Sequence, residues 1–361
     1  MRIAIDISQV IYGTGTSVYT AELIKNLLDI YPENEFILFG GSLRRRNELL
    51  AFASSYSSVK KVILPFSPTF LDLIWNKLHF LKIERLIGKF NVLHTSDWTE
   101  PPSKLSKVTT IHDLAPVLLP EFTHPKIVEV HKRRLFWVAR ESCAVIVPSE
   151  SSKIDAIKFG IDSERIRVIP EAIRSGFAKA GKKKLDEIKN KYKISGKYAF
   201  SVGVSPRKNT PRIIESFKRV RKEAGLQTLV IAGSTANTKL KRNDFVSYLG
   251  HVPTNDLAAL YMGSAVFLYP SLYEGFGLPI LEAFASNTPV VTSNTSSMPE
   301  VAGDAAVLVD PGSVNDIAEG IIKALGNSKK LIIKGRKRLK FFSWRKTATK
   351  TMKVYEECAK N

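Results

Sequence analysis

Residues 265–285 read AVFLYPSLYEGFGLPILEAFA, a single strand-turn-helix unit. The apolar run Ala265 to Tyr269 predicts a buried strand, and Pro279 to Ala285 predicts a helix. Glu274 and a Gly-Phe-Gly turn lie between them. Backbone N–H groups at a helix start can bind a ligand, and Glu282 follows about two helical turns later. The two carboxylates could therefore hold a ligand with many hydroxyl groups; the alternative is a helix cap with a solvated glutamate.

The same alternation of strand and helix runs through the chain and restarts near Tyr198. In the first half we expect strands at Arg2 to Ile7, Glu35 to Phe39, Val59 to Leu64, Val92 to His94, Val108 to His112 and Ala144 to Pro148. Helices are expected at Thr16 to Leu28, Phe70 to Ile87, Pro125 to Arg140 and Ser149 to Phe159. In the second half we expect strands at Tyr198 to Val202, Thr228 to Ala232, Val246 to Leu249, Ala265 to Tyr269, Val290 to Thr292 and Ala306 to Val309, with helices at Pro211 to Glu223, Pro279 to Ala285 and Val314 to Leu325. This pattern predicts two doubly wound α/β domains with parallel sheets, joined near Pro170 to Phe177.

Polar or glycine-rich loops follow several of the expected strands. Ligands of open α/β sheets bind outside the carboxyl ends of the strands, so two facing domains would form a cleft lined by such loops. The loops are Gly13-Thr14-Gly15-Thr16, His112-Asp113, Arg207-Lys208-Asn209, Glu274 and Ser296 to Glu300. The glycine loop alone is a weak phosphate-binding signal, because it lacks the dinucleotide fingerprint and the phosphate-loop lysine.

The composition excludes several classes of protein. A length of 361 residues suggests two domains, and a hydrophobic content of 44% is ordinary for a globular protein. No apolar run approaches the ~18–20 residues of a membrane-spanning helix, and the strand-like N-terminus is not a signal peptide. Cys143 and Cys358 are too few for a disulfide framework; they indicate a reducing compartment and offer no metal site.

The net charge of +20 lies mostly in the second half. Residues 1–172 carry 22 basic and 19 acidic side chains, a net charge of +3, whereas residues 173–361 carry 32 and 15, a net charge of +17. The basic residues of that half concentrate at helical spacing in Lys179 to Lys197, Arg207 to Lys222 and Lys329 to Lys353. Solvated helix faces explain them most simply. Contact with an anionic membrane is the next explanation, and nucleic acid is not expected because no binding signature accompanies the charge.

Taken together, these segments resemble the family 4 retaining glycosyltransferases of GT-B architecture, nearly from end to end. The matching segments are 269–283, which contains the Glu-x7-Glu pattern, and 108–114, 148–153, 206–209, 288–291 and 298–306. The resemblance implies two doubly wound Rossmann-like domains facing across a cleft. It divides the chain into an acceptor-side domain over 1–172, a nucleotide-sugar-binding domain over 173–340, and a C-terminal helix over 341–361 that returns to the first domain.

The resemblance also implies a role for each site residue. The sugar hydroxyls would be held by Glu274 and the loop backbone at Gly275, Phe276, Gly277 and Leu278. Arg207 and Lys208 would neutralise the diphosphate, Gly15 would let its loop approach it, and Glu282 would accept from the ribose. His112 would lie beside the transferred sugar, and the backbone at Gly250 and Val252 would flank the base. Cations aimed at the leaving diphosphate stabilise its developing charge, so a metal ion is not expected.

The sequence departs from the family pattern at three places. Val204 stands where many relatives have an arginine, which makes the diphosphate assignment firmer for Lys208 than for Arg207. Asn287 replaces a common glycine, and asparagine also tolerates left-handed backbone. Glu171 and Ala172 replace a common Asn-Gly at the domain junction, which could stiffen or redirect it.

The predicted activity is transfer of a hexose from a nucleoside-diphosphate sugar to a hydroxyl of a glycan or lipid-linked acceptor. GDP-mannose is the preferred donor, because 111–114 and 297–300 resemble segments of mannosyl-transferring relatives; UDP-hexoses and dTDP-rhamnose fit the same loops. A sugar phosphorylase or epimerase, or a non-catalytic protein that binds an anionic membrane or nucleic acid, are the alternatives of other classes. We expect a cytoplasmic protein, with peripheral membrane contact through the aromatic segment Phe66 to Phe90 as one option.

Overall fold

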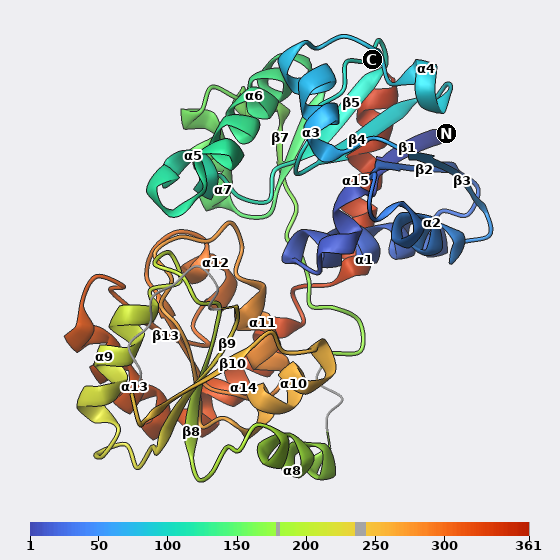
Figure 1. The fold of residues 1–361 in the computed structure, drawn as a ribbon. Helices are drawn as coiled ribbons and strands as arrows, with labels where there is room; N and C mark the ends of the chain where they lie inside the picture. The colour runs from blue at the N-terminus through green and yellow to red at the C-terminus, as the bar shows by residue number, and fades with distance from the viewer. Residues whose placement is uncertain (178–180, 235–242, 361) are drawn as a thin grey trace. The chain divides into compact units, whose positions relative to one another are not determined.

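The computed structural model describes residues 1–177, 181–234 and 243–360. The chain forms two compact units. Unit 1 comprises Met1–Ala172 and the described residues from Ser343 onward, and unit 2 comprises Ile173–Phe342. Each unit is a sheet with helices on both faces (Figure 1), which confirms the prediction of two α/β domains. Within the described residues, no helix has both the length and the apolar character needed to cross a bilayer.

Unit 1 is built on a seven-stranded parallel sheet. The strands are β1 (Arg2–Asp6), β2 (Glu35–Gly41), β3 (Val59–Leu64), β4 (Val92–Ser96), β5 (Ser106–Thr110), β6 (Ala144–Val147) and β7 (Ile166–Val168). Their spatial order is β3-β2-β1-β4-β5-β6-β7, so the direction of strand addition reverses between β1 and β4. Ligands of doubly wound sheets bind at such a reversal, at the carboxyl ends of the strands.

The two faces of this sheet are covered by different helices. One face packs against η2 (Asp72–Lys77), α4 (Glu84–Ile87), α6 (Pro125–Glu141) and α7 (Glu150–Lys158). The other carries α1 (Gly15–Ile30), α2 (Arg46–Ser54) and α15 (Trp344–Ala359). Short helices complete the connections: η1 (Ser8–Tyr12), α3 (Pro68–Leu71), α5 (Ala115–Leu118), η3 (Pro120–Phe122) and η4 (Ser163–Arg165).

Unit 2 is built on a six-stranded parallel sheet. Its strands are β8 (Tyr198–Val202), β9 (Thr228–Ala232), β10 (Val246–Gly250), β11 (Val266–Tyr269), β12 (Val290–Ser293) and β13 (Val307–Val309). The order β10-β9-β8-β11-β12-β13 places the reversal between β8 and β11. The loops after these two strands contain Arg207, Lys208 and Glu274, so the sheet topology itself brings the predicted donor residues together.

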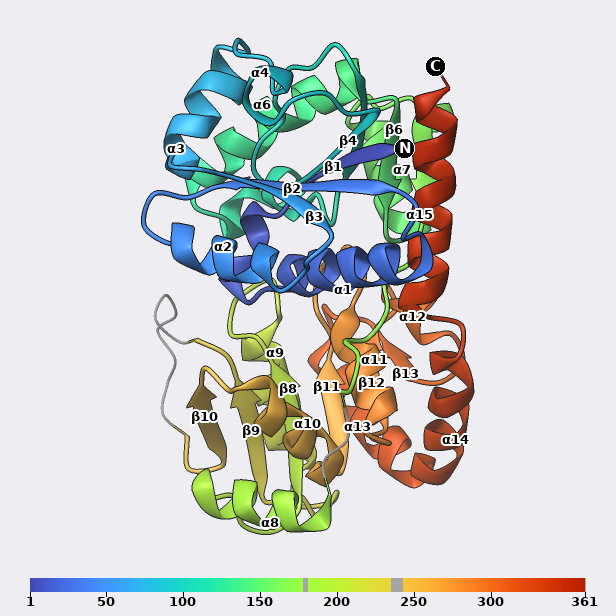
Figure 2. The ribbon, with the colours of Figure 1, turned by 90° about the vertical axis from the view of Figure 1, so that its right-hand side faces the viewer.

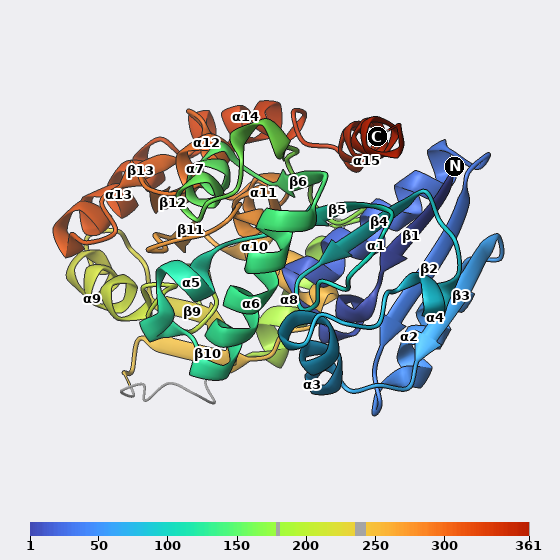
Figure 3. The same ribbon diagram turned by 90° about the horizontal axis from the view of Figure 1, so that it is seen from above.

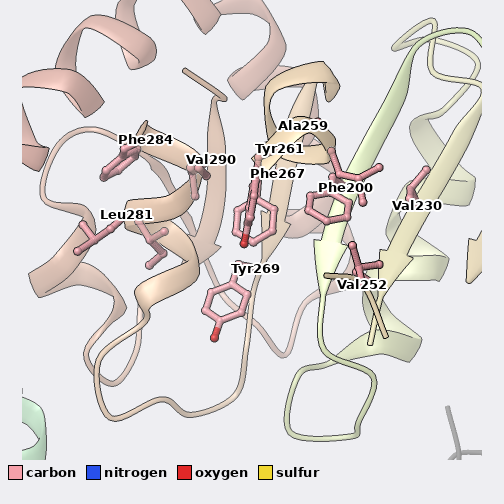
Figure 4. Packing of buried hydrophobic residues seen from close by; sticks show 14 of the residues in the cluster. Phe200, Val230, Val252, Ala259, Tyr261, Phe267, Tyr269, Leu281, Phe284 and Val290 are labelled. Atoms are coloured by element: carbon pink, nitrogen blue, oxygen red, sulfur yellow. The ribbon is translucent and has the colours of Figure 1, made fainter. Parts of the chain in front are cut away.

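Successive apolar side chains of these strands point to opposite faces of the sheet, and each face has its own hydrophobic core. On one face, α9 (Thr210–Val220) and α13 (Val314–Gly326) cover Leu229, Ile231 and Leu268. On the other, the strands contact α8 (Lys182–Lys191), α10 (Thr254–Gly263), α11 (Leu278–Ala285) and α12 (Met298–Ala302), with α14 (Ser328–Leu339) packed against α11. Figure 4 shows this second core, in which Tyr261, Phe267 and Tyr269 lie side by side.

The C-terminal helix α15 belongs to unit 1. Figure 2 shows it beside α1, and Figure 3 looks along its axis. Cys358 of α15 forms a disulfide with Cys143, which lies just before β6. The inference of a reducing compartment from two cysteines is therefore not supported, because disulfides persist mainly in oxidising environments. Sequence could not reveal this pair, since 215 positions separate residues whose Cα atoms lie 6.0 Å apart.

The prediction of one amphipathic helix over Phe70 to Ile87 is wrong. The chain instead forms the end of α3, then η2 and α4, and it turns sharply between them. His79 and Leu81 adopt left-handed backbone at the turn, with φ of 49° and 48°. Leu78, next to this turn, is 57% exposed. Apolar spacing alone could not show this turn, because no glycine or proline marks it.

Candidate active site

The cluster of Arg207, Lys208 and Glu274 occupies the strand-order reversal of unit 2. Lys208 Nζ lies 2.7 Å from Glu274 Oε1, and Arg207 Nη1 lies 3.0 Å from Glu274 Oε2. Burial by itself would raise the pKa of the Glu274 carboxyl, but the charges of Lys208 and Arg207 outweigh burial and lower it to about 2. Glu274 is therefore ionised at neutral pH and suited to accept hydrogen bonds, not to donate a proton.

Tyr269, at the end of β11, completes this cluster. Lys208 Nζ donates to the Tyr269 hydroxyl at 2.7 Å, and the ammonium lies 4.8 Å from the centre of the ring. Burial and the nearby Glu274 charge raise the pKa of Tyr269 well above its usual range, so the hydroxyl stays neutral. This tyrosine was not singled out from the sequence, because it reads as an ordinary core residue of the strand.

Polar side chains from neighbouring loops hold the Glu274 loop in place. The hydroxyls of Ser296 and Ser297 donate to Glu274 O at 2.6 and 2.8 Å, and Ser297 also bonds Phe276 O at 2.7 Å. Asn209, in left-handed backbone with φ 62°, donates from Nδ2 to Pro270 O and to Pro311 O. The predicted loops after β8, β11 and β12 are thus tied together by side chain to backbone bonds.

The Gly275 to Leu278 segment forms the start of α11. Gly277 has φ 107°, a conformation that favours glycine, and it caps the helix that Leu278 begins. Phe276 is buried and its ring lies 5.7 Å from that of Phe342. The phenylalanine therefore anchors the turn at the start of α11.

Glu282 lies further along α11 and has a different environment from Glu274. The Tyr261 hydroxyl donates to Glu282 Oε2 at 2.8 Å. Burial raises the pKa of the Glu282 carboxyl, and the Tyr261 bond and the Arg174 charge only partly oppose that effect. The two carboxylates of the Glu-x7-Glu pattern are thus held by separate partners, and Tyr261 and Arg174 are contacts that the sequence did not reveal.

Gly250 is the last residue of β10, the edge strand of the same sheet, and Val252 follows two positions later. Gly250 has φ 66° and its carbonyl accepts from Gly233 N at 2.8 Å. A glycine stands at or just after the end of each of three neighbouring strands, β8, β9 and β10. A Cβ on Gly233 would lie 3.1 Å from Gly203 Cα, so the backbones approach closely there. The Val252 side chain is buried in the core, so only the backbone of Val252 is available to a ligand.

In unit 1, His112 lies just beyond β5 among buried polar groups. His112 Nδ1 lies 3.0 Å from Glu171 Oε1, and Nε2 lies 3.4 Å from Ser96 Oγ. The ring of Tyr19 packs edge-on against the imidazole, with ring centres 4.6 Å apart. Glu171, identified in the sequence only as a departure at the domain junction, is thus a direct partner of a predicted site residue.

Gly15 is the first residue of α1 in unit 1. Thr14 caps the helix through a reciprocal bond with Ser17, and Gly13 supplies the left-handed backbone with φ 69°. The glycine that the turn itself requires is therefore Gly13. Among the described residues, no group of three or more His, Cys, Asp and Glu side chains is arranged to hold a metal ion.

Comparison with known proteins agrees with this fold. Residues 13–175 match the model of Glycosyltransferase Family 4, and residues 182–340 match that of Glycosyl transferases group 1. The chain is 32% identical to the O-antigen chain mannosyltransferase B of Escherichia coli, over 95% of this chain and 96% of that protein. It is 29% identical to the O-antigen chain mannosyltransferase RfbU of Salmonella typhimurium, over 66% and 67% of the two chains.

The same fold is found among solved structures. A glycosyltransferase from Rickettsia africae superposes with a TM-score of 0.74 at 16% identity, over 100% of this chain and 99% of that one. The two parallel-sheet units define the GT-B fold of glycosyltransferases. The chain belongs to the family 4 glycosyltransferases, in a mannosyltransferase-like branch.

Proposed function

We propose that this chain is a retaining, metal-independent mannosyltransferase that moves mannose from GDP-mannose to a hydroxyl of a glycan or lipid-linked acceptor. The observation that carries the proposal is the Lys208–Glu274–Arg207 cluster at the strand-order reversal of unit 2. The likeness to two O-antigen mannosyltransferases supports mannose as the sugar and cell-surface polysaccharide synthesis as the setting. A cytoplasmic location, which would supply the donor, stays a prediction, and the Cys143–Cys358 disulfide argues against a reducing compartment.

The geometry of unit 2 suggests how the donor is held. The ionised Glu274 would accept hydrogen bonds from mannose hydroxyls. Lys208 and Arg207 would interact electrostatically with the diphosphate while they remain close to Glu274. These three side chains together carry a net charge of +1, which would attract the doubly negative diphosphate and offset part of its charge. Glu282, with its raised pKa and its Tyr261 partner, would accept from the ribose.

In the proposed reaction the acceptor attacks the sugar on the face that the diphosphate leaves. The bond from the anomeric carbon to the phosphate oxygen breaks, and a bond from that carbon to the acceptor oxygen forms. The departing phosphate oxygen takes the acceptor proton. Lys208 and Arg207 would stabilise the charge that builds on this oxygen, which is why no metal ion is required. A glycosyl-enzyme adduct trapped in the absence of acceptor and detected by mass spectrometry would rule this route out.

Unit 1 would supply His112 and Gly15, with the imidazole beside the transferred sugar and the glycine loop near the diphosphate. These roles come from the family resemblance. The contacts of His112 with Glu171, Tyr19 and Ser96 support a fixed ring orientation. We also propose that unit 1 binds the acceptor.

We further propose peripheral contact with an anionic membrane through the surface around η2. Phe70, Leu73, Leu78 and Phe80 are each more than 40% exposed there, beside the exposed Lys77 and Lys82. Exposed apolar side chains with flanking lysines suit the interface of an anionic bilayer. Flotation with vesicles containing phosphatidylglycerol should carry the wild type upward more than a Leu78→Ser/Phe80→Ser variant. Equal flotation of the two proteins would exclude this surface.

The donor is tested by incubation of the protein with GDP-mannose, UDP-glucose and dTDP-rhamnose and a lipid-linked glycan extract. GDP-mannose should give transfer that survives an excess of EDTA, with the anomeric configuration retained by NMR. Thermal shift with GDP, UDP and dTDP provides a second readout. A shift with UDP alone, or transfer from UDP-glucose alone, would contradict GDP-mannose and leave a hexosyltransferase of another donor.

A further inference from the structure

The approach of Glu171 to His112 crosses one strand of unit 1. His112 follows β5 and Glu171 follows β7, and β6 lies between them in the sheet. Their side chains nevertheless meet, with Glu171 Oε1 3.0 Å from His112 Nδ1. Neighbouring strands lie about 5 Å apart, so only a long side chain directed along the sheet edge reaches this far.

The Glu171–His112 contact is energetically important because it is buried. Glu171 is 5% exposed, and a buried carboxylate is costly unless a donor satisfies it. A carboxylate only accepts, so the hydrogen between the two groups resides on Nδ1. Nε2 is therefore the ring nitrogen left for a second partner, and its nearest partner within the protein, Ser96 Oγ, lies at the long distance of 3.4 Å.

Other contacts fix the plane of the imidazole. The Tyr19 ring meets it at an interplanar angle of 80°, and the Tyr19 hydroxyl is itself bonded to Thr110 Oγ1 at 3.1 Å. Trp344 of α15 packs edge-on against the far side of Tyr19, with ring centres 5.8 Å apart. Glu171 is thus the charged member of a support that orients His112.

We propose that Glu171 is a positioning residue for transfer: its carboxylate holds the Nδ1–H form of His112 and presents Nε2 to the donor sugar. The inference rests on the proposed function of His112 and goes beyond it by naming the group that sets the histidine's tautomer. It also gives the departure from Asn-Gly at the domain junction a role in the site. Glu171 acts through His112 and need not touch the substrate.

Two variants separate the charge from the hydrogen bond. In Glu171→Gln the amide oxygen can still accept from Nδ1–H, whereas Glu171→Ala removes the acceptor. The control is Glu141→Gln, which alters a second histidine–glutamate pair of the same unit, in which His79 Nε2 lies 2.8 Å from Glu141 Oε1, and also weakens the ion pair of Glu141 with the buried Lys107. Any general loss of stability should affect the control as well.

The experiment combines kinetics with ¹⁵N NMR of protein labelled at histidine, with the His112 signal assigned by its loss in His112→Asn. We expect kcat to fall about 10- to 100-fold in Glu171→Ala, with the KM for the donor changed by less than about threefold. Glu171→Gln should retain more of kcat than Glu171→Ala, and Glu141→Gln should retain wild-type kcat.

The NMR readout does not depend on turnover. The wild type and Glu171→Gln should show a protonated Nδ1 with Nε2 as the second site, and Glu171→Ala should show a changed tautomer distribution. An unchanged His112 signal in Glu171→Ala, or a changed signal with wild-type kcat, would overturn the positioning role. A wild type that transfers from none of the three donors would overturn the proposed function instead, whatever its histidine signals show.

Discussion

Lys208 Nζ and Glu274 Oε1 lie 2.7 Å apart in unit 2, although 66 positions separate the two residues in sequence. The loop after β8 supplies the cation and the loop after β11 supplies the carboxylate, and these strands are neighbours at the strand-order reversal. The pair links a residue expected to hold the sugar to a residue expected to hold the diphosphate. Substitutions at this pair and its supports should therefore affect donor use before they affect the fold.

Replacement of Lys208 should reduce transfer strongly. We expect Lys208→Met to lower kcat by about 10²- to 10³-fold, because a cation aimed at the leaving diphosphate is lost. Steady-state transfer from GDP-mannose measures this effect. The control is Lys191→Met, which removes the ion pair between an exposed lysine and the buried Asp256 in the same unit. Similar losses in the two variants would mean that charge in general, and not its position at Lys208, supports activity.

The two carboxylates of the Glu-x7-Glu pattern should respond oppositely to neutralisation. The folded-state pKa of Glu274 is lowered to about 2, so its ionised form stabilises the fold above pH 4.5, and that contribution is lost as the pH falls toward 2. The folded-state pKa of Glu282 is raised by burial, so its ionisation weakens the fold as the pH rises. Denaturant unfolding at pH 7 should show Glu274→Gln to be less stable than the wild type.

The same measurement at pH 3 and on Glu282→Gln provides the check. The deficit of Glu274→Gln should shrink at pH 3, and Glu282→Gln should be no less stable than the wild type at pH 7. A deficit of Glu274→Gln that is equal at both pH values would show that the ion cluster does not stabilise the fold through the carboxylate charge.

Gly203 should be required for the position of Lys208. A Cβ at Gly203 would lie 2.9 Å from Lys208 Cγ, and the residue has φ 84°. Gly225 shares the left-handed backbone, with φ 61°, but a Cβ there meets nothing within 4 Å. Both alanine variants should lose about 1 kcal/mol of stability through backbone strain, and Gly203→Ala alone should lose transfer activity. Wild-type kcat in Gly203→Ala would contradict the required placement of the lysine.

The disulfide predicts a measurable effect of reduction. Cys143–Cys358 ties α15 to the sheet of unit 1, so a reductant or Cys358→Ser should lower the free energy of unfolding by about 2–5 kcal/mol. Cys143→Ser and the double variant should match the single variant. Two thiols that titrate in the non-reduced, denatured protein, with no effect of reductant on the melting temperature, would show that the bond does not form in solution.

Much of the fold followed from local sequence patterns. Alternating apolar strands and amphipathic helices predicted both sheets, and strand-end loops identified Lys208 and Glu274, because topology carries such loops to one edge. The prediction of one helix from Phe70 to Ile87 was wrong because the chain makes a left-handed turn at His79 and Leu81, which tertiary packing stabilises. The residues of this segment include no local turn signal.

The partners within the site were harder to predict than its principal residues. Tyr269 reads as core, Tyr261 lies outside every predicted strand and helix, and Glu171 reads as a departure at a junction. Each becomes a site contact only through a long-range hydrogen bond: to Lys208, to Glu282 and to His112, respectively. Such pairings depend on which loops the sheet order places side by side, which no local pattern reports.

The most direct test of the central claim is transfer of labelled mannose from GDP-mannose by the wild type and by Glu274→Ala, with folding of the variant verified by circular dichroism. The account predicts transfer by the wild type with retained anomeric configuration, and a loss of at least about 100-fold in the folded Glu274→Ala variant. Wild-type turnover in that folded variant would contradict the account.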